Sequence, residues 1–146
     1  MAYETAAALV VLDTNIVLDL FVFSDPATAV LRSALESGAV CWVATSVMRD
    51  ELERVLDYTQ LQPRMAFYGV DKATVLAQFD RLAQLREVAP RCMYVCKDVD
   101  DQKFIDLAAQ QPCTLVSKDK AVLALRKRLL MLGVLVNKRY EIVSKL

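Results

Sequence analysis

The chain of 146 residues carries 18 acidic and 18 basic side chains, and 55% of its residues are hydrophobic. This composition excludes a disordered chain, and we expect residues 1–146 to form a single domain with a substantial core. Histidine is absent, which excludes histidine bases, histidine-activated nucleophiles and histidine metal ligands. Hydrolytic chemistry would therefore have to use carboxylates, with or without a hard metal ion.

Charge is unevenly distributed along the chain although the total is neutral. After Asp119, the basic residues stand against Glu141 alone; they are Lys120, Arg126, Lys127, Arg128, Lys138, Arg139 and Lys145. A basic C-terminal quarter suits contacts with a phosphate backbone. An ordinary solvated face gives the same pattern, so composition alone leaves both interpretations open.

The cysteines and the N-terminus indicate a cytoplasmic protein. Cys92 and Cys96 lie four residues apart, and neither a second close pair nor a histidine completes a zinc set. We therefore expect reduced, mostly buried thiols, as in cytoplasmic proteins. The N-terminus has no basic region and its apolar run stops at Asp13, so we expect neither a signal peptide nor a membrane span.

The first predicted element is a strand over residues 8–12, which runs directly into Asp13, Thr14 and Asn15. A short run of branched apolar side chains is typical of a strand buried on both faces of a parallel sheet. Ligands bind at the carboxyl ends of such strands, so Asp13 is a candidate functional acid. The alternative is a polar turn that only caps the next helix.

Two further elements are predicted before the next candidate acid. An apolar patch over residues 16–23 leads to Ser24-Asp25-Pro26, which is a helix-start signal, and the helix that follows ends at Gly38. A second buried strand is predicted over residues 39–44.

The next predicted helix is capped by Ser46, ends near Asp57 and contains an acid on its apolar side. At about 100° per residue, Glu51 falls inside the apolar arc, whereas the other acids of the helix fall opposite it. The arc consists of Val47, Met48, Leu52, Val55 and Leu56. A carboxylate facing the core is costly unless it is paired, protonated or bound to a metal. A boundary glutamate whose carboxylate reaches water is the alternative.

Residues 58–70 are predicted to form a loop, and a helix is predicted to start at Asp71. Residues 91–95 are predicted to be the third strand, which ends in three acids, Asp98, Asp100 and Asp101. Asp101 begins the apolar stripe of the helix that follows. Capping and the helix dipole favour acids in a first turn, but they explain one of these acids better than all three.

The last predicted elements are a strand over 113–117 that leads to Lys118 and Asp119, a helix over 120–130, a weaker strand over 134–136 and an edge segment over 140–146. This alternation predicts a three-layer α/β/α sandwich around a mostly parallel sheet of four to five strands. Acids that follow parallel strands meet at one edge, so we expect Asp13, Asp98–Asp101 and Asp119 to converge, with Glu51 turned inward. A divalent cation would relieve their repulsion.

In this order, the motifs resemble those of PIN-domain proteins, and in particular the toxin components of type II toxin–antitoxin systems. The motifs are Val11-Leu12-Asp13-Thr14-Asn15, Ser46 with Glu51-Leu52, Asp98-x-Asp100-Asp101-x-Lys103-Phe104, and Leu115-Val116-Ser117-Lys118-Asp119. The resemblance matches Asp13, Glu51, Asp101 and Asp119 with the catalytic, metal-binding acids. It leaves Asp98 and Asp100 as further candidate ligands. It also matches Asn15 and Ser117 with neighbouring polar residues, where many relatives have threonine in place of Ser117.

The resemblance implies an endoribonuclease that depends on Mg²⁺ or Mn²⁺ and serves as the toxin of a toxin–antitoxin pair. Lys118, Lys120 and the cluster that begins at Arg126 would then position the RNA backbone. Relatives are commonly homodimers and many bind a small antitoxin protein, so we expect both partners here.

Two other functions remain open at the level of the sequence. The first is a catalytically inactive PIN-like module that binds nucleic acid or protein. The second is a phosphoryl-transfer domain of the receiver or haloacid-dehalogenase type. It is disfavoured because Asn15 stands where the phosphatase pattern needs an aspartate.

Overall fold

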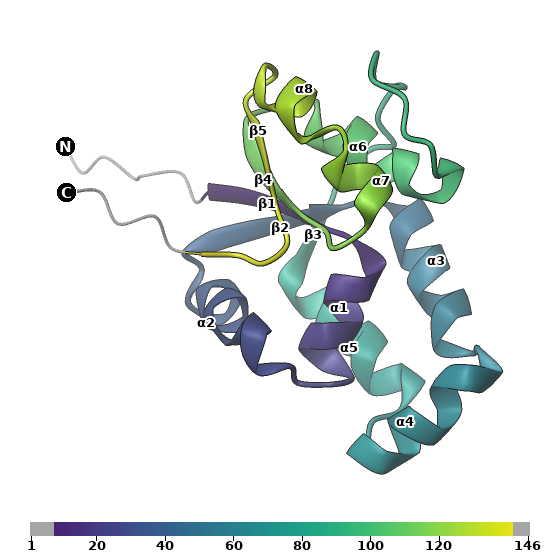
Figure 1. The fold of residues 1–146 in the computed structure, drawn as a ribbon. Coiled ribbons are helices and arrows are strands. Elements are labelled where there is room, and N and C mark those ends of the chain that lie inside the picture. The colour runs from purple at the N-terminus through teal and green to yellow at the C-terminus, as the bar shows by residue number, and fades with distance from the viewer. Residues whose placement is uncertain (1–7, 142–146) are drawn as a thin grey trace, which may run out of the picture.

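The protein is seen here in a computed structural model that describes residues 8–141 and is built around a five-stranded sheet (Figure 1). The strand order is β3-β2-β1-β4-β5, and all neighbouring strands run parallel. The strands are β1 (Ala8–Leu12), β2 (Val40–Ala44), β3 (Ala83–Leu85), β4 (Cys113–Val116) and β5 (Val134–Asn137). The predicted α/β fold with a mostly parallel sheet is therefore confirmed.

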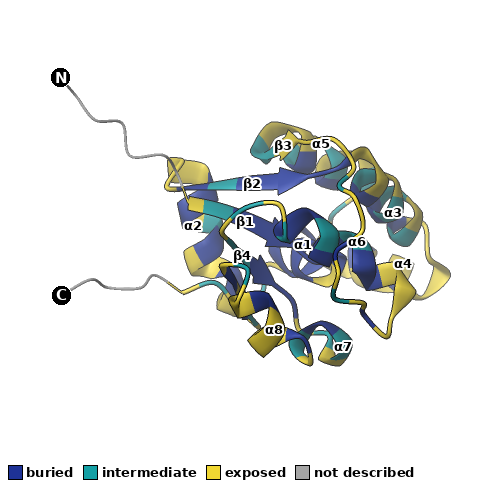
Figure 2. Ribbon diagram, turned by 90° about the horizontal axis from the view of Figure 1, so that it is seen from above, coloured by how far each residue is buried: buried dark blue, intermediate teal, exposed yellow. Residues whose placement is uncertain are grey.

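Helices cover both faces of this sheet and complete the three layers (Figure 1). One face carries α1 (Thr14–Phe21), α2 (Ala29–Ser37), α3 (Ser46–Leu56), α4 (Gln62–Tyr68) and α5 (Lys72–Leu82). The other face carries α6 (Gln102–Ala108), α7 (Lys120–Leu123) and α8 (Arg126–Leu130). Figure 2 shows that the central strands β1, β2 and β4 are buried between these layers toward their carboxyl ends, whereas β1 and β4 are more exposed where they begin. Burial on both faces explains why these strands are continuous apolar runs.

The core on the first face is centred on Trp42 of β2. Its ring stacks on Phe21 of α1 at 6.2 Å between centroids and meets the edge of Phe79 of α5 at 4.9 Å. All three side chains are buried. This contact fixes α1 and α5 against the same strand.

The prediction of a strand over residues 91–95 was wrong, because the third strand is β3, directly after α5. Side chains of α6 satisfy the backbone of this segment instead. Asp106 Oδ1 accepts from the Cys92 amide at 2.8 Å, and Gln102 Oε1 accepts from the Cys96 amide at 2.6 Å. Backbone groups bonded in this way need no neighbouring strand.

This correction changes how the acids around Asp101 reach the site. They follow an irregular segment rather than the end of a strand, and they form the 3₁₀ turn Val99–Asp101 together with its cap, Asp98. The turn leads straight into α6, which packs on β1 and β4. α6 therefore carries these acids to the edge of the sheet.

Three helical regions also differ from the prediction. Residues 58–70 form the 3₁₀ turn Thr59–Leu61 and α4, which has Pro63 in its first turn and ends at Gly69, with φ +65°. These are standard helix signals, so the predicted loop was wrong. Thr45, not Ser46, caps α3, and the single helix over 120–130 is two, α7 and α8.

Three other expectations concern the cysteines, a membrane span and the C-terminal edge segment. Cys41, Cys92, Cys96 and Cys113 are free thiols, and Cys92 and Cys96 are buried. Within residues 8–141, no single helix is long and apolar enough to cross a membrane; only Thr14–Phe21 with Pro26–Ser37, a pair bent by 105°, meets the length and composition criteria. Most of the edge segment predicted over 140–146 lies outside the described residues.

Candidate metal centre and basic groove

An acidic pocket of about 320 Å³ opens beside the ends of the central strands β1 and β4. β1 leads directly to Asp13, and Asp119 follows β4 by three residues. The pocket is lined by Asp13, Glu51, Asp98, Asp101 and Asp119, together with Thr14, Asn15, Leu18, Val55, Tyr58, Gln60 and Leu61. The structure thus brings together the four acids proposed as catalytic and Asp98, one of the two further candidate ligands.

Asp13 has two structural partners, one for each carboxylate oxygen. Its Oδ1 accepts from the Asn15 amide at 3.3 Å and caps α1, as the alternative interpretation supposed. Its Oδ2 accepts from the hydroxyl of Ser117, which is fully buried, at 2.7 Å. Burial raises the pKa of Asp13, while these two hydrogen bonds oppose the rise. Capping is therefore real, but it uses only one of the two oxygens.

Asp98, Asp101 and Asp119 form the tightest acidic cluster, and we call them the aspartate trio. One carboxylate oxygen from each lies within 4.8 Å of the others. Asp98 and Asp119 each cap a helix with one carboxylate oxygen. Asp98 Oδ1 accepts from the Asp100 amide at 3.0 Å, and Asp119 Oδ1 accepts from the Ala121 amide at 2.8 Å. The other oxygen of each carboxylate is left for a ligand.

Asp101 is the member of the trio that lacks compensation. Only 8% of it is exposed, and its Oδ2 has no hydrogen-bond partner among residues 8–141. Burial, with the nearby charges of Asp13 and Asp119, raises the pKa of Asp101 to about 8. A buried carboxylate with a bare oxygen is costly unless a cation or proton joins it. An all-oxygen donor set of this kind fits a hard divalent cation.

Glu51 lies in the same pocket but is already paired. Its Oε1 accepts from the Thr14 hydroxyl, and its Oε2 accepts from the Lys103 ammonium at 2.5 Å. The Glu51 side chain is 18% exposed, whereas those of Glu53 and Asp57 are 46% and 63% exposed. Glu51 therefore faces inward from α3, but it does not belong to the aspartate trio.

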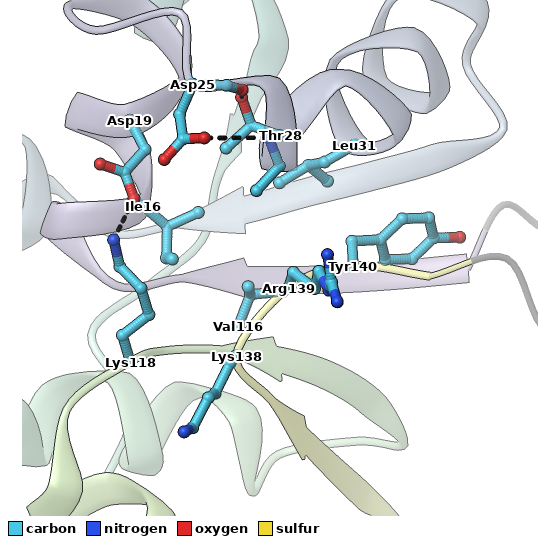
Figure 3. Close-up of a pocket in the computed structure, with 11 residues that line it drawn as sticks. Ile16, Asp19, Asp25, Thr28, Leu31, Val116, Lys118, Lys138, Arg139 and Tyr140 are labelled. Atoms are coloured by element: carbon cyan, nitrogen blue, oxygen red, sulfur yellow. Dashed lines mark hydrogen bonds and ion pairs between the residues drawn. The ribbon is translucent and has the colours of Figure 1, made fainter.

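Two of the remaining sequence candidates lie away from the acidic pocket. Asp100 is exposed and does not line it. Figure 3 shows the Lys118 ammonium directed at Asp19 of α1, with which it forms an ion pair. Lys118 and Asp19 line a separate cavity of about 40 Å³, beside Lys138 and Tyr140. Lys118 is thus engaged outside the acidic pocket.

The basic residues of α8 line a separate groove of about 510 Å³. Arg126, Lys127 and Arg128 are exposed there, together with Lys97, while Lys120 is exposed outside it. Lys97 directly precedes Asp98, and α7 joins Asp119 to the α8 cations. We call this feature the basic groove; the chain connects it to the acidic pocket on both sides.

Three residues near the two cavities were missed as candidates: Thr14, Lys97 and Lys103. The available signal was their position, because each lies within two residues of a proposed acid. The ion pair between Lys103 and Glu51, however, spans 52 residues. No local pattern in the sequence reveals that contact.

A family model described as the PIN domain matches residues 9–121. The chain belongs to the PIN-domain family. PIN domains are typically metal-dependent nucleases, so membership indicates nuclease activity in general and makes the acidic cluster a candidate metal site. The matched region contains every acid of the pocket and ends before the α8 cations. A search among curated proteins finds no match for this PIN domain.

Proposed function

We propose that this PIN domain is an endoribonuclease that depends on Mg²⁺ or Mn²⁺. One observation carries the proposal: the bare, buried oxygen of Asp101 within the aspartate trio. Such an oxygen needs a cation or a proton, and the surrounding donors, which are all oxygens, suit a hard divalent cation. The basic groove beside the pocket supports a polyanionic substrate.

Each acid has a defined part in this proposal. Asp98, Asp101 and Asp119 would hold the cation, with Asp13 next to them and Glu51 available after it leaves Lys103. Ser117 orients Asp13 through its buried hydrogen bond. A bound Mg²⁺ or Mn²⁺ would polarise the scissile phosphodiester and lower the pKa of a water molecule.

Substrate positioning is assigned to the cations that are free to contact phosphate. The α8 cluster and Lys97 line the basic groove, and Lys120 is exposed close by. Lys118 contributes less directly in this proposal, because Asp19 already holds its ammonium. Asn15 is exposed at the rim of the acidic pocket, where its amide can contact the substrate backbone.

The finer identity of the protein follows the resemblance in its motifs. We propose RNA rather than DNA as the substrate and a toxin role within a toxin–antitoxin pair. We also propose a homodimer, a small antitoxin partner and a cytoplasmic location. The most direct observation for the pair would be a neighbouring reading frame that encodes a small DNA-binding protein.

The test of the proposed activity is cleavage of a structured RNA in the presence of Mn²⁺. We expect cleavage by the wild-type protein and a loss of about 100-fold or more in Asp13→Asn and Asp101→Asn, which remove a charge from the site. Asp80→Asn is the matched control, because Asp80 pairs with Arg49 on the surface. Equal cleavage by wild type and Asp13→Asn at matched purity would overturn the proposed ribonuclease activity.

A second candidate function is a binding module without catalysis. The engagement of Glu51 by Lys103 favours it, because one proposed catalytic acid is already neutralised. Calorimetry separates the two functions. RNA binding without measurable Mn²⁺ binding would select the binding module.

A further inference from the structure

Glu51 of α3 is held by residues from two other helices. Thr14 is the first residue of α1, Glu51 lies in the middle of α3, and Lys103 lies in the first turn of α6. The Thr14 hydroxyl and the Lys103 ammonium each donate to a different oxygen of Glu51. We call these three residues the Glu51 latch.

The latch is protected from water and supported from outside the pocket. The side chains of Lys103 and Glu51 are only 20% and 18% exposed. The ammonium also donates to the backbone carbonyl of Asp100 and lies 4.9 Å from the centroid of the Phe104 ring. A partly buried ion pair with additional hydrogen bonds holds its geometry better than a surface pair.

The aspartate trio presents the opposite situation. No Lys or Arg forms an ion pair with Asp98, Asp101 or Asp119 among residues 8–141. The pocket therefore contains carboxylates without a basic partner, at the aspartate trio, and one carboxylate whose two oxygens are both occupied, at Glu51. Among residues 8–141, Lys103 is the cation that forms an ion pair with an acid of this pocket.

We propose that Lys103 is the resident counter-cation of the acidic pocket and sets its affinity for divalent ions. The aspartate trio would hold the cation, and Glu51 would be free to join them only after Lys103 releases it. This inference rests on the proposed metal-dependent function. Lys103 acts through Glu51, so it is a positioning residue.

The experiment compares Lys103→Met with wild type by Mn²⁺ calorimetry and by thermal unfolding with and without Mn²⁺. Removing the ammonium leaves none of the five acids of the pocket in an ion pair within residues 8–141. We expect the metal-free Tm to fall by roughly 3 °C. We also expect Mn²⁺ to bind about tenfold more tightly and to restore the lost stability.

Two variants serve as controls. Lys103→Arg keeps the charge and should retain the wild-type Mn²⁺ affinity within about threefold. Lys72→Met removes a lysine of an exposed pair, 2.9 Å from Asp57 and outside the pocket, so it should leave Mn²⁺ affinity unchanged. The contrast between Lys103→Met and Lys72→Met separates the latch from a general effect of charge.

The Mn²⁺ affinity of Lys103→Met decides the outcome. Tighter binding than wild type supports the inference. Equal or weaker binding overturns it, while Mn²⁺ binding by the wild type leaves the proposed function intact. If neither protein binds Mn²⁺, the proposed metal-dependent function fails and the inference fails with it.

Discussion

At the scale of single residues, the acids of the pocket differ in how many of their oxygens have partners. Both oxygens of Asp13 and both oxygens of Glu51 accept hydrogen bonds, whereas Asp101 keeps a bare Oδ2. The pocket therefore combines positioned carboxylates with one that lacks compensation. The uncompensated acid is the one whose protonation should respond most to pH and to added cation.

The raised pKa of Asp101 predicts that the metal-free protein loses stability as pH rises. The folded state holds this proton up to about pH 8, whereas the unfolded chain releases it near the ordinary value of 3.8. The folded state thus binds more protons between these values, so the free energy of unfolding falls with increasing pH across that window. The raised pKa of Asp13 acts in the same direction.

Urea unfolding at several pH values within this window, in the presence of a chelator, measures the effect. Asp101→Asn should flatten the decline, because the amide has no proton to lose. Asp50→Asn, at an exposed position on α3, should keep the wild-type slope. Identical slopes for wild type and Asp101→Asn would contradict the prediction.

At the scale of elements, the site depends on helices that pack on the central strands. α3 supplies Glu51, and the 3₁₀ turn that leads into α6 supplies Asp101. Thr45 begins α3 by accepting from the Met48 amide at 3.4 Å, and Gln102 and Asp106 of α6 hold the segment before the acids. The acids are therefore positioned by elements that pack against the buried core.

Phe79→Ala should destabilise the protein by about 3–5 kcal/mol, because it removes a buried ring that packs on Trp42. Urea unfolding followed by the fluorescence of Trp42, the single tryptophan, gives the free energy directly. Phe67→Ala makes the same substitution at a residue that is 82% exposed, so its effect should stay within about 0.5 kcal/mol. A similar loss in both variants would refute this account of the core.

At the scale of the whole molecule, a net charge of zero conceals two features of opposite charge. The acidic pocket and the basic groove lie next to one another along the chain, joined through Lys97-Asp98 and through α7. A polyanion contacts the groove favourably but is repelled by the pocket until a cation is present. In the proposed function, electrostatics would therefore couple the binding of a polyanionic substrate to the binding of the metal ion.

Replacing Arg126, Lys127 and Arg128 together with glutamine should weaken RNA binding and make it less dependent on salt. Loss of three phosphate contacts lowers the slope of log affinity against log salt by about two to three. Fluorescence anisotropy with a labelled RNA, in the Asp13→Asn background, measures binding without cleavage. A control with Lys72, Arg81 and Arg86 replaced should keep the slope; equal losses in both would argue against the groove.

The sequence by itself determined the fold class and the strands that lead to Asp13 and Asp119. The apolar run over 8–12 and the Leu-Val pair that ends the strand over 113–116 are local signals, typical of strands whose ends are buried in a parallel sheet. Helical periodicity likewise indicated that Glu51 turns inward. Local pattern was sufficient here because each signal lies within a single element.

Only the tertiary structure decided how the acids are compensated. Lys103 neutralises Glu51 across 52 residues, and Asp19 engages Lys118 across 99. The side chains of α6 replace the expected third strand by bonding the backbone of the preceding segment. Hydrogen bonds and ion pairs of this kind depend on which helices meet in space, and neither periodicity nor composition records that.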